Sequence, residues 1–219
     1  MYNHKNKVKQ KHKYGVCVID IGSPRLGNIG WSLIDGQTEK EWSGDQLDQL
    51  FPLVSEILDR QGLLLGLEAP IFVPLRSNLL HATKARKGEE RRPWSAGAGA
   101  QVLAMNLPIM VYILEKFMDC CKEILFLLEE EKFLGSPKQV LIFEALVSGS
   151  DKGESHIADA QIMAKYCHQF SKKYLLPKTI LEEEKGVRFF NLAAAALLKC
   201  GATNDISNLG LPAPIYKPN

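Results

Sequence analysis

Hydrophobic residues fall along this chain in two patterns, short continuous runs and longer stripes at spacings of three and four. Short apolar runs bounded by glycine or turn residues are typical of buried strands, and the stripes are typical of helices with one buried face. The runs predict five strands, at residues 14–22, 29–34, 38–42, 63–67 and 139–147. The other apolar segments predict helices at residues 45–60, 101–133, 155–174 and 187–200. Pro52 and Pro108 fall inside two of these helices, where each predicts a kink or a restart.

The order of these segments predicts a single α/β domain over residues 1–219. A turn at Asp35 and Gly36 joins the second and third strands, so the first three strands form an antiparallel meander. The fourth strand is apolar at every position, as in the middle of a parallel sheet. Between the fourth and fifth strands, residues 75–138 form a basic loop and a helical insertion. Residues 1–13 carry five lysines and no acid, so they form either a basic arm for a polyanion or a solvated, flexible tail.

The composition is that of an ordinary folded protein, with 46% hydrophobic and 24% charged residues among 219. The most apolar stretch, residues 107–128, contains five charged residues, whereas a membrane-spanning helix needs about 20 nearly uncharged ones, so we expect no membrane segment. The five cysteines include no C-x-x-C pair, and no apolar signal segment follows the basic start. Both features predict a cytoplasmic protein with free thiols. The net charge of +2 is too small to indicate nucleic acid without local evidence.

Four acidic residues lie in apolar or helix-start positions and are the candidates for chemistry. Asp20, Glu68 and Glu144 each lie in or at the end of a predicted strand, and Asp159 lies at the start of a predicted helix. Each alone has a structural explanation, such as capping a turn, pairing with an arginine or favouring the helix dipole. Together they suggest a site for Mg²⁺ or Mn²⁺, because buried carboxylates need cations and hard ions prefer oxygen ligands. His156 lies three residues before Asp159, so on a helix both side chains share one face. His156 is therefore a candidate metal ligand or proton-transfer group, and the alternative is a helix-start histidine with no role in the site.

The order of these features resembles the ribonuclease H-like superfamily, and within it the predicted ribonuclease H-like nucleases and Holliday-junction resolvases. The resembling features are an acid at the end of the first strand, the Gly30-Trp31 hairpin, an acid ending the fourth strand and His-x-x-Asp-Ala on a late helix. They cover residues 14–68 and 139–174. The resemblance implies a mixed five-stranded sheet with helices on both faces, in which the first and fourth strands are neighbours.

The same resemblance implies a metal-dependent nuclease that hydrolyses phosphodiester bonds in DNA or RNA by a two-metal mechanism. It assigns metal and catalytic roles to five residues: Asp20, Glu68, Asp159, Glu144 and His156. The basic segment 83–94 directly follows the strand that bears Glu68, so Arg86, Arg91 and Arg92 would hold phosphates and Trp94 would stack on a base. The alternative is a solvated loop with Trp94 tucked into the core.

Two other functions remain open at the level of sequence. Ile21-Gly22-Ser23 is similar to the phosphate-binding hairpin of actin-like phosphotransferases, but these enzymes need two copies of the fold and this chain has room for one. The other alternative is a non-catalytic module that keeps the fold to bind a partner. Nucleic acid is the expected partner of the nuclease, and a homodimer is possible in either case.

Overall fold

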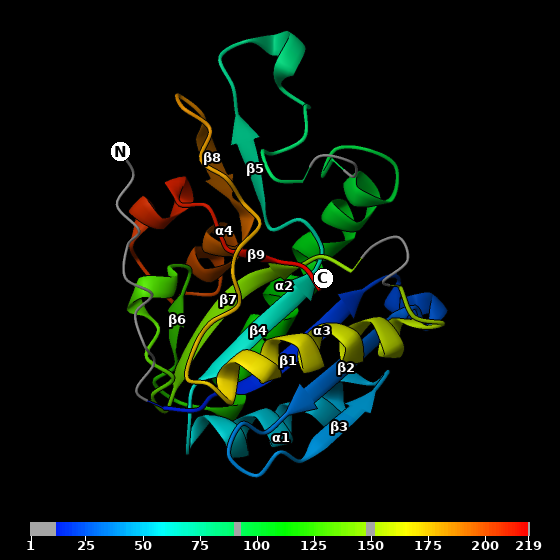
Figure 1. Cartoon of the computed structure of the whole chain (residues 1–219), viewed down its shortest axis with the longest axis vertical. Coiled ribbons are helices and arrows are strands. Elements are labelled where there is room, and N and C mark those ends of the chain that lie inside the picture. Colours follow the sequence, from blue (N-terminus) through cyan, green and yellow to red (C-terminus); the bar gives the residue numbers. More distant parts are fainter. Residues whose placement is uncertain (1–11, 90–92, 148–151, 219) are drawn as a thin grey trace.

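A mixed sheet of seven strands forms the centre of the computed structural model, which describes residues 12–89, 93–147 and 152–218 (Figure 1). Its strands are β1 (Gly15–Ile21), β2 (Ile29–Ile34), β3 (Glu41–Gly44), β4 (Leu63–Glu68), β6 (Leu125–Leu127), β7 (Gln139–Ala145) and β9 (Ile215–Tyr216). Six lie in the order β3-β2-β1-β4-β7-β6, and β9 pairs with β7. β2 is antiparallel to β1 and β3, whereas β1, β4, β7 and β6 run parallel. The predicted meander and the pairing of the first and fourth strands are confirmed.

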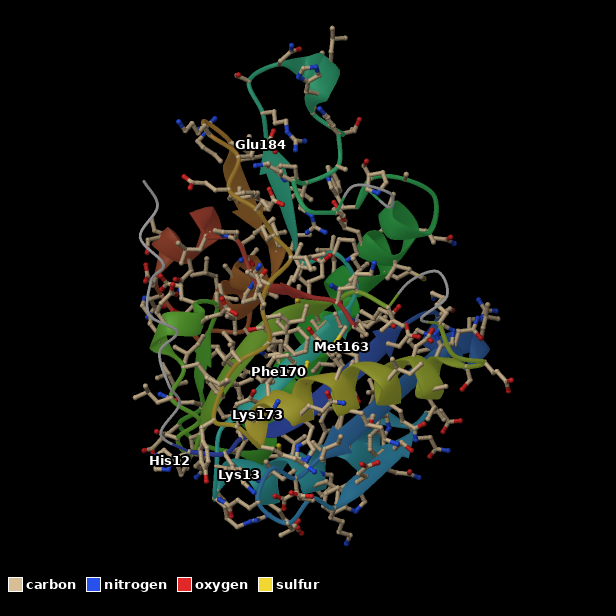
Figure 2. The ribbon with its side chains drawn as sticks, viewed as in Figure 1. His12, Lys13, Met163, Phe170, Lys173 and Glu184 are labelled. Carbon is tan, nitrogen blue, oxygen red and sulfur yellow. The ribbon has the colours of Figure 1, made fainter. Side chains whose placement is uncertain are left out.

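In the described part of the chain, four α-helices cover the two faces of this sheet: α1 (Leu47–Leu58), α2 (Ala98–Cys120), α3 (His156–Ser171) and α4 (Leu192–Lys199). Alternate residues of β1 point to opposite faces. Cys17 and Ile19 pack in the same hydrophobic cluster as α1, α2 and α4, whereas Val16 and Val18 pack in the cluster of α3. Figure 2 labels Met163, one of the buried residues of α3 that belong to the second cluster. The predicted α/β class with helices on both faces is therefore confirmed.

A second, two-stranded sheet follows the carboxyl end of β4. It pairs β5 (Phe72–Leu75) antiparallel with β8 (Arg188–Asn191), and with the short helix η2 (Leu79–His81) it forms an arm that projects from the main sheet (Figure 1). Arg76 holds the arm together, because its guanidinium donates to the backbone carbonyls of His81, Lys84 and Ala85. It also pairs at 2.9 Å with Glu184, the residue labelled on the arm in Figure 2. Other short helices within the described residues are η1 (Pro24–Leu26), η3 (Glu130–Lys132) and η5 (Ile206–Gly210).

Several predicted elements are wrong in extent or type. The helix predicted over 101–133 begins at Ala98, continues through Pro108 and ends at Cys120, after which the chain forms β6. The segment 187–200 is half strand and half helix, because β8 pairs with β5 before α4 begins. The main sheet has seven strands rather than five, since β6 and β9 both pair with β7. The third strand lies at Glu41–Gly44 rather than 38–42, and α1 continues through Pro52.

α2 is the one helix in the described part of the chain that is long and apolar enough to span a membrane. The charges between residues 107 and 128 led us to expect no such segment, but the apolar stretch begins earlier, at Ala98. A helix of this kind is weak evidence for a membrane, because core helices of soluble proteins pass the same test. Only 22% of the most apolar 18-residue window of α2 is buried. Met110, Ile113 and Phe117 of this helix are fully buried in the cluster shared with α1 and α4.

Candidate metal site

Two neighbouring strands deliver two carboxylates to the same place. β1 and β4 are parallel, and their register sets Asp20 beside Glu68 at the carboxyl end of both strands. Side chains alternate between the two faces along a strand, so residues of the same parity, an even number of positions apart, share a face. Asp20 has the parity of Val16 and Val18, which pack against α3, so its side chain faces that helix. Glu68 has the parity of Leu64, which packs in the same cluster. Strand pairing and strand parity together bring these two acids to one face of the sheet.

The start of α3 supplies the third carboxylate and the histidine. Ser155 caps the helix by accepting a hydrogen bond from the amide of Ala158 at 3.2 Å, so the first turn begins at His156. Asp159 also lies in that first turn, three residues after His156, so the two side chains are on the same side of the helix. The helix start rests on β2 at Gly30, the residue paired with Asp20. A Cβ at Gly30 would lie only 2.3 Å from the backbone nitrogen of Ile157, so glycine permits this close approach.

Asp20, Glu68 and Asp159 converge as an acidic triad. Each offers a carboxylate oxygen, and these oxygens all lie within 4.8 Å of one another. Asp20 and Asp159 are each 4% exposed, and the side chain of Glu68 is 11% exposed. Oε2 of Glu68 is buried and has no hydrogen-bond partner within the described residues. Such an unsatisfied buried carboxylate oxygen is costly, and a hard divalent cation would satisfy it. The donor set therefore fits a hard divalent metal ion.

The close packing of three acids changes their proton affinities. Burial, assisted by the charge of Asp20, raises the pKa of Glu68 to about 9. Burial also raises the pKa of Asp20, although its hydrogen bond to His156 opposes this shift. Nδ1 of His156 lies 2.6 Å from Oδ2 of Asp20. Like charges at short range and loss of water both disfavour ionised carboxylates, so the triad favours binding of a proton or a cation.

Lys152 is a member of the site that the sequence analysis did not identify. Its Nζ lies 3.4 Å from Oδ2 of Asp159 and 3.8 Å from Oε1 of Glu68. The next residue, Gly153, donates its backbone N–H to Oδ1 of Asp159 at 2.5 Å. Burial alone would lower the pKa of Lys152, but the three carboxylates together raise it above its ordinary value. No hydrophobic pattern marks this lysine, and only its position four residues before His156 could have suggested it.

Glu144 and Arg86, both predicted to be functional, form a separate buried network. Glu144 lies on β7 with the parity of Val140 and Ile142, which belong to the face covered by α1, α2 and α4. It therefore points away from the triad. The guanidinium of Arg86 donates to both carboxylate oxygens of Glu144, at 2.8 and 2.5 Å. Arg86 is only 2% exposed. The interpretation of Glu144 as a ligand and of Arg86 as a phosphate-binding side chain is corrected here, because each neutralises the other in the interior.

The remaining predicted substrate residues divide between the described and undescribed parts of the chain. Arg91 and Arg92 lie outside the described residues. Trp94 is half-buried, and its indole Nε1 donates to the backbone carbonyl of Lys84 at 3.4 Å. The structure thus brings together Asp20, Glu68, Asp159 and His156, and it separates them from Glu144 and Arg86.

Comparisons with protein-family models, curated proteins and solved structures each found no match to this chain. What the chain does must therefore be inferred from its own residues and their geometry.

Proposed function

We propose that this protein is a divalent-metal-dependent nuclease of the ribonuclease H-like superfamily, which hydrolyses phosphodiester bonds in nucleic acid. The observation that carries the proposal is the convergence of the acidic triad from β1, β4 and α3 at the carboxyl ends of two parallel strands. In open α/β sheets this edge is where ligands bind. The strand order β3-β2-β1-β4-β7 and the His-x-x-Asp start of α3 support the same superfamily.

The residues of the triad would hold Mg²⁺ or Mn²⁺ through Asp20, Glu68 and Asp159. When bound, such an ion supplies an activated water and stabilises the leaving oxygen of the scissile phosphodiester. His156 fixes the Asp20 carboxylate through Nδ1, and its side chain is 39% exposed. Its Nε2 is then left to exchange a proton with substrate or water. The backbone N–H of Gly153 fixes Asp159 in the same way, so two of the three carboxylates are oriented before any ligand arrives.

A cytoplasmic location and a nucleic-acid partner complete the proposal. All five cysteines are free thiols, which suits a reducing compartment. We retain Arg91 and Arg92 as candidate phosphate contacts, since Arg86 is committed to the interior. That residues 1–219 form a single domain, and that the protein can form a homodimer, stay predictions.

The proposal is tested by titrating Mg²⁺ or Mn²⁺ into cleavage assays on single-stranded, duplex and branched DNA and RNA. We expect the wild type to cut at least one substrate and a chelator to stop it. Asp159→Asn should abolish cleavage, because a neutral amide is a poorer ligand for a hard ion. Asp119→Asn is the matched control, since Asp119 is an exposed acid on α2 and its loss should leave cleavage unchanged.

Two results would contradict the nuclease proposal. One is cleavage by Asp159→Asn at the wild-type rate and metal concentration. The other is a wild type that cuts none of the substrates with either ion. In the second case, retained binding of nucleic acid or protein would favour the non-catalytic module.

A further inference from the structure

Lys152 occupies the position where a cation is needed. Its ammonium contacts Asp159 at 3.4 Å and Glu68 at 3.8 Å, the distances of an ion pair with each. Among the described residues, it is the one lysine or arginine that forms an ion pair with the acidic triad. A divalent ion held by the same carboxylates would be in direct electrostatic competition with this ammonium.

The lysine is placed so that it can leave without disturbing the site. Its side chain is 46% exposed, whereas those of Asp159 and Glu68 are 6% and 11% exposed, so the ammonium lies on the solvent side of the triad. The backbone next to it is fixed, because the N–H of Gly153 donates to Asp159 and Gly153 packs against Ala158. A long flexible stem on a fixed backbone allows the charge to swing outward while the carboxylates keep their positions.

The geometry points to Lys152 as a built-in counter-ion, which neutralises the acidic triad in the absence of metal and is displaced when a divalent ion binds. This inference rests on the proposed function, since it takes the triad as the metal site. After displacement the ammonium lies at the entrance of the site, where it meets the phosphate of an incoming nucleic acid. Lys152 thus exchanges its ion pairs with Asp159 and Glu68 for a contact with a phosphate of the substrate.

Competition of this kind has a definite sign. The apparent affinity for the metal ion equals its intrinsic affinity multiplied by the fraction of protein in the binding-competent state. Here that state is the one in which the ammonium of Lys152 is displaced from the triad. Removing the ammonium should therefore tighten metal binding, whereas removing an ordinary stabilising contact would weaken it. The same removal leaves the triad without its cation in the metal-free protein, so thermal stability without metal should fall.

The test compares four proteins: wild type, Lys152→Met, Lys152→Arg and the control Lys165→Met. Lys165 is an exposed lysine of α3 that pairs with Glu41. Replacing it with methionine changes the net charge by the same amount as Lys152→Met. Binding of Mn²⁺ alone is measured by calorimetry or electron paramagnetic resonance, and unfolding is measured with and without Mn²⁺. For Lys152→Met we expect roughly three- to tenfold tighter Mn²⁺ binding and a lower melting temperature without metal. Lys152→Arg and Lys165→Met should bind Mn²⁺ as the wild type does.

The outcomes separate this inference from the proposed function. Equal Mn²⁺ affinity in Lys152→Met and wild type, or weaker affinity in the variant, would overturn the counter-ion role and leave the metal site in place. Mn²⁺ binding by none of the four proteins would overturn both proposals. If cleavage is established, Lys152→Met should also show a raised KM with nucleic acid despite its tighter metal binding. That opposite pair of effects is not expected from a lysine that only stabilises the fold.

Discussion

Replacing Arg86 with methionine removes the cation from a buried network that ties the base of the arm to the central sheet. Arg86 donates to Glu144 on β7, to Glu89 at 2.7 Å and to the carbonyl of Phe72 on β5. Its guanidinium also stacks over the Phe72 ring at 4.4 Å. Methionine keeps much of the apolar volume but leaves two buried carboxylates without a cation.

The size of the expected effect follows from this burial. The side chains of Arg86, Glu89 and Glu144 are 1%, 2% and 3% exposed, so solvent does not screen the loss. Removing one partner of a buried ion pair typically costs about 3–5 kcal/mol. For a chain of this length each kcal/mol lowers the melting temperature by about 2–4 °C, so Arg86→Met should lose roughly 6–20 °C.

The loss should depend on pH with a definite sign. Burial already raises the pKa of Glu144 while Arg86 opposes that shift, so removing Arg86 raises it further. A carboxyl whose folded pKa lies above its unfolded value costs stability as the pH rises from about 4.5. The deficit of Arg86→Met should therefore be largest at neutral and alkaline pH and shrink toward pH 4.

Urea and thermal unfolding at pH 4, 6 and 8 measure this prediction. Arg188→Met is the control, because Arg188 is exposed on β8 and its replacement should change stability by less than about 0.5 kcal/mol. Unfolding of Arg86→Met at the wild-type temperature, together with weakened nucleic-acid binding, would refute the reasoning and restore Arg86 as a substrate contact.

Two other predictions concern the edge of the sheet and the start of α3. Asp35 accepts hydrogen bonds from Arg60, Gln61 and two backbone amides, and although burial alone would raise its pKa, these bonds hold it well below its usual range. Asp35→Asn should cost about 1–3 kcal/mol in urea unfolding at pH 7. The cost should begin to shrink as the pH falls below about 4, where the unfolded aspartate takes up a proton before the folded one, and it should keep shrinking toward the lower folded pKa; an equal cost at pH 7 and pH 2.5 would contradict this. Gly30→Ala should push the start of α3 off β2 and weaken Mn²⁺ binding, at a stability cost of about 1–3 kcal/mol, because its Cβ would lie 2.3 Å from a backbone nitrogen. Wild-type Mn²⁺ affinity in that variant would show that the packing of α3 on Gly30 does not set the triad.

The elements that the sequence predicts well are those whose own burial pattern decides their structure. β1, β2, β4 and β7 are mostly apolar runs buried on both faces, and α1 carries a regular apolar stripe. Such segments form the same element in any packed arrangement, because a local pattern dictates what they must bury. The elements that it misses are short strands that exist only through pairing. β8 pairs with β5 from a segment more than 100 residues away, and the two residues of β9 pair with β7.

The site divides in the same way between sequence and tertiary structure. The acids at the ends of β1 and β4 and at the start of α3 are visible as carboxylates among apolar neighbours, and the structure brings Asp20, Glu68 and Asp159 together. Glu144 looks the same in sequence, because β7 is buried on both faces and its pattern does not reveal which face a residue joins. Strand parity against the neighbouring helices, and an arginine 58 residues away in the chain, decide that this acid is neutralised in the core. Lys152 is likewise invisible until the fold sets its ammonium beside two carboxylates, because electrostatic pairing depends on distance in space and not on spacing in the chain.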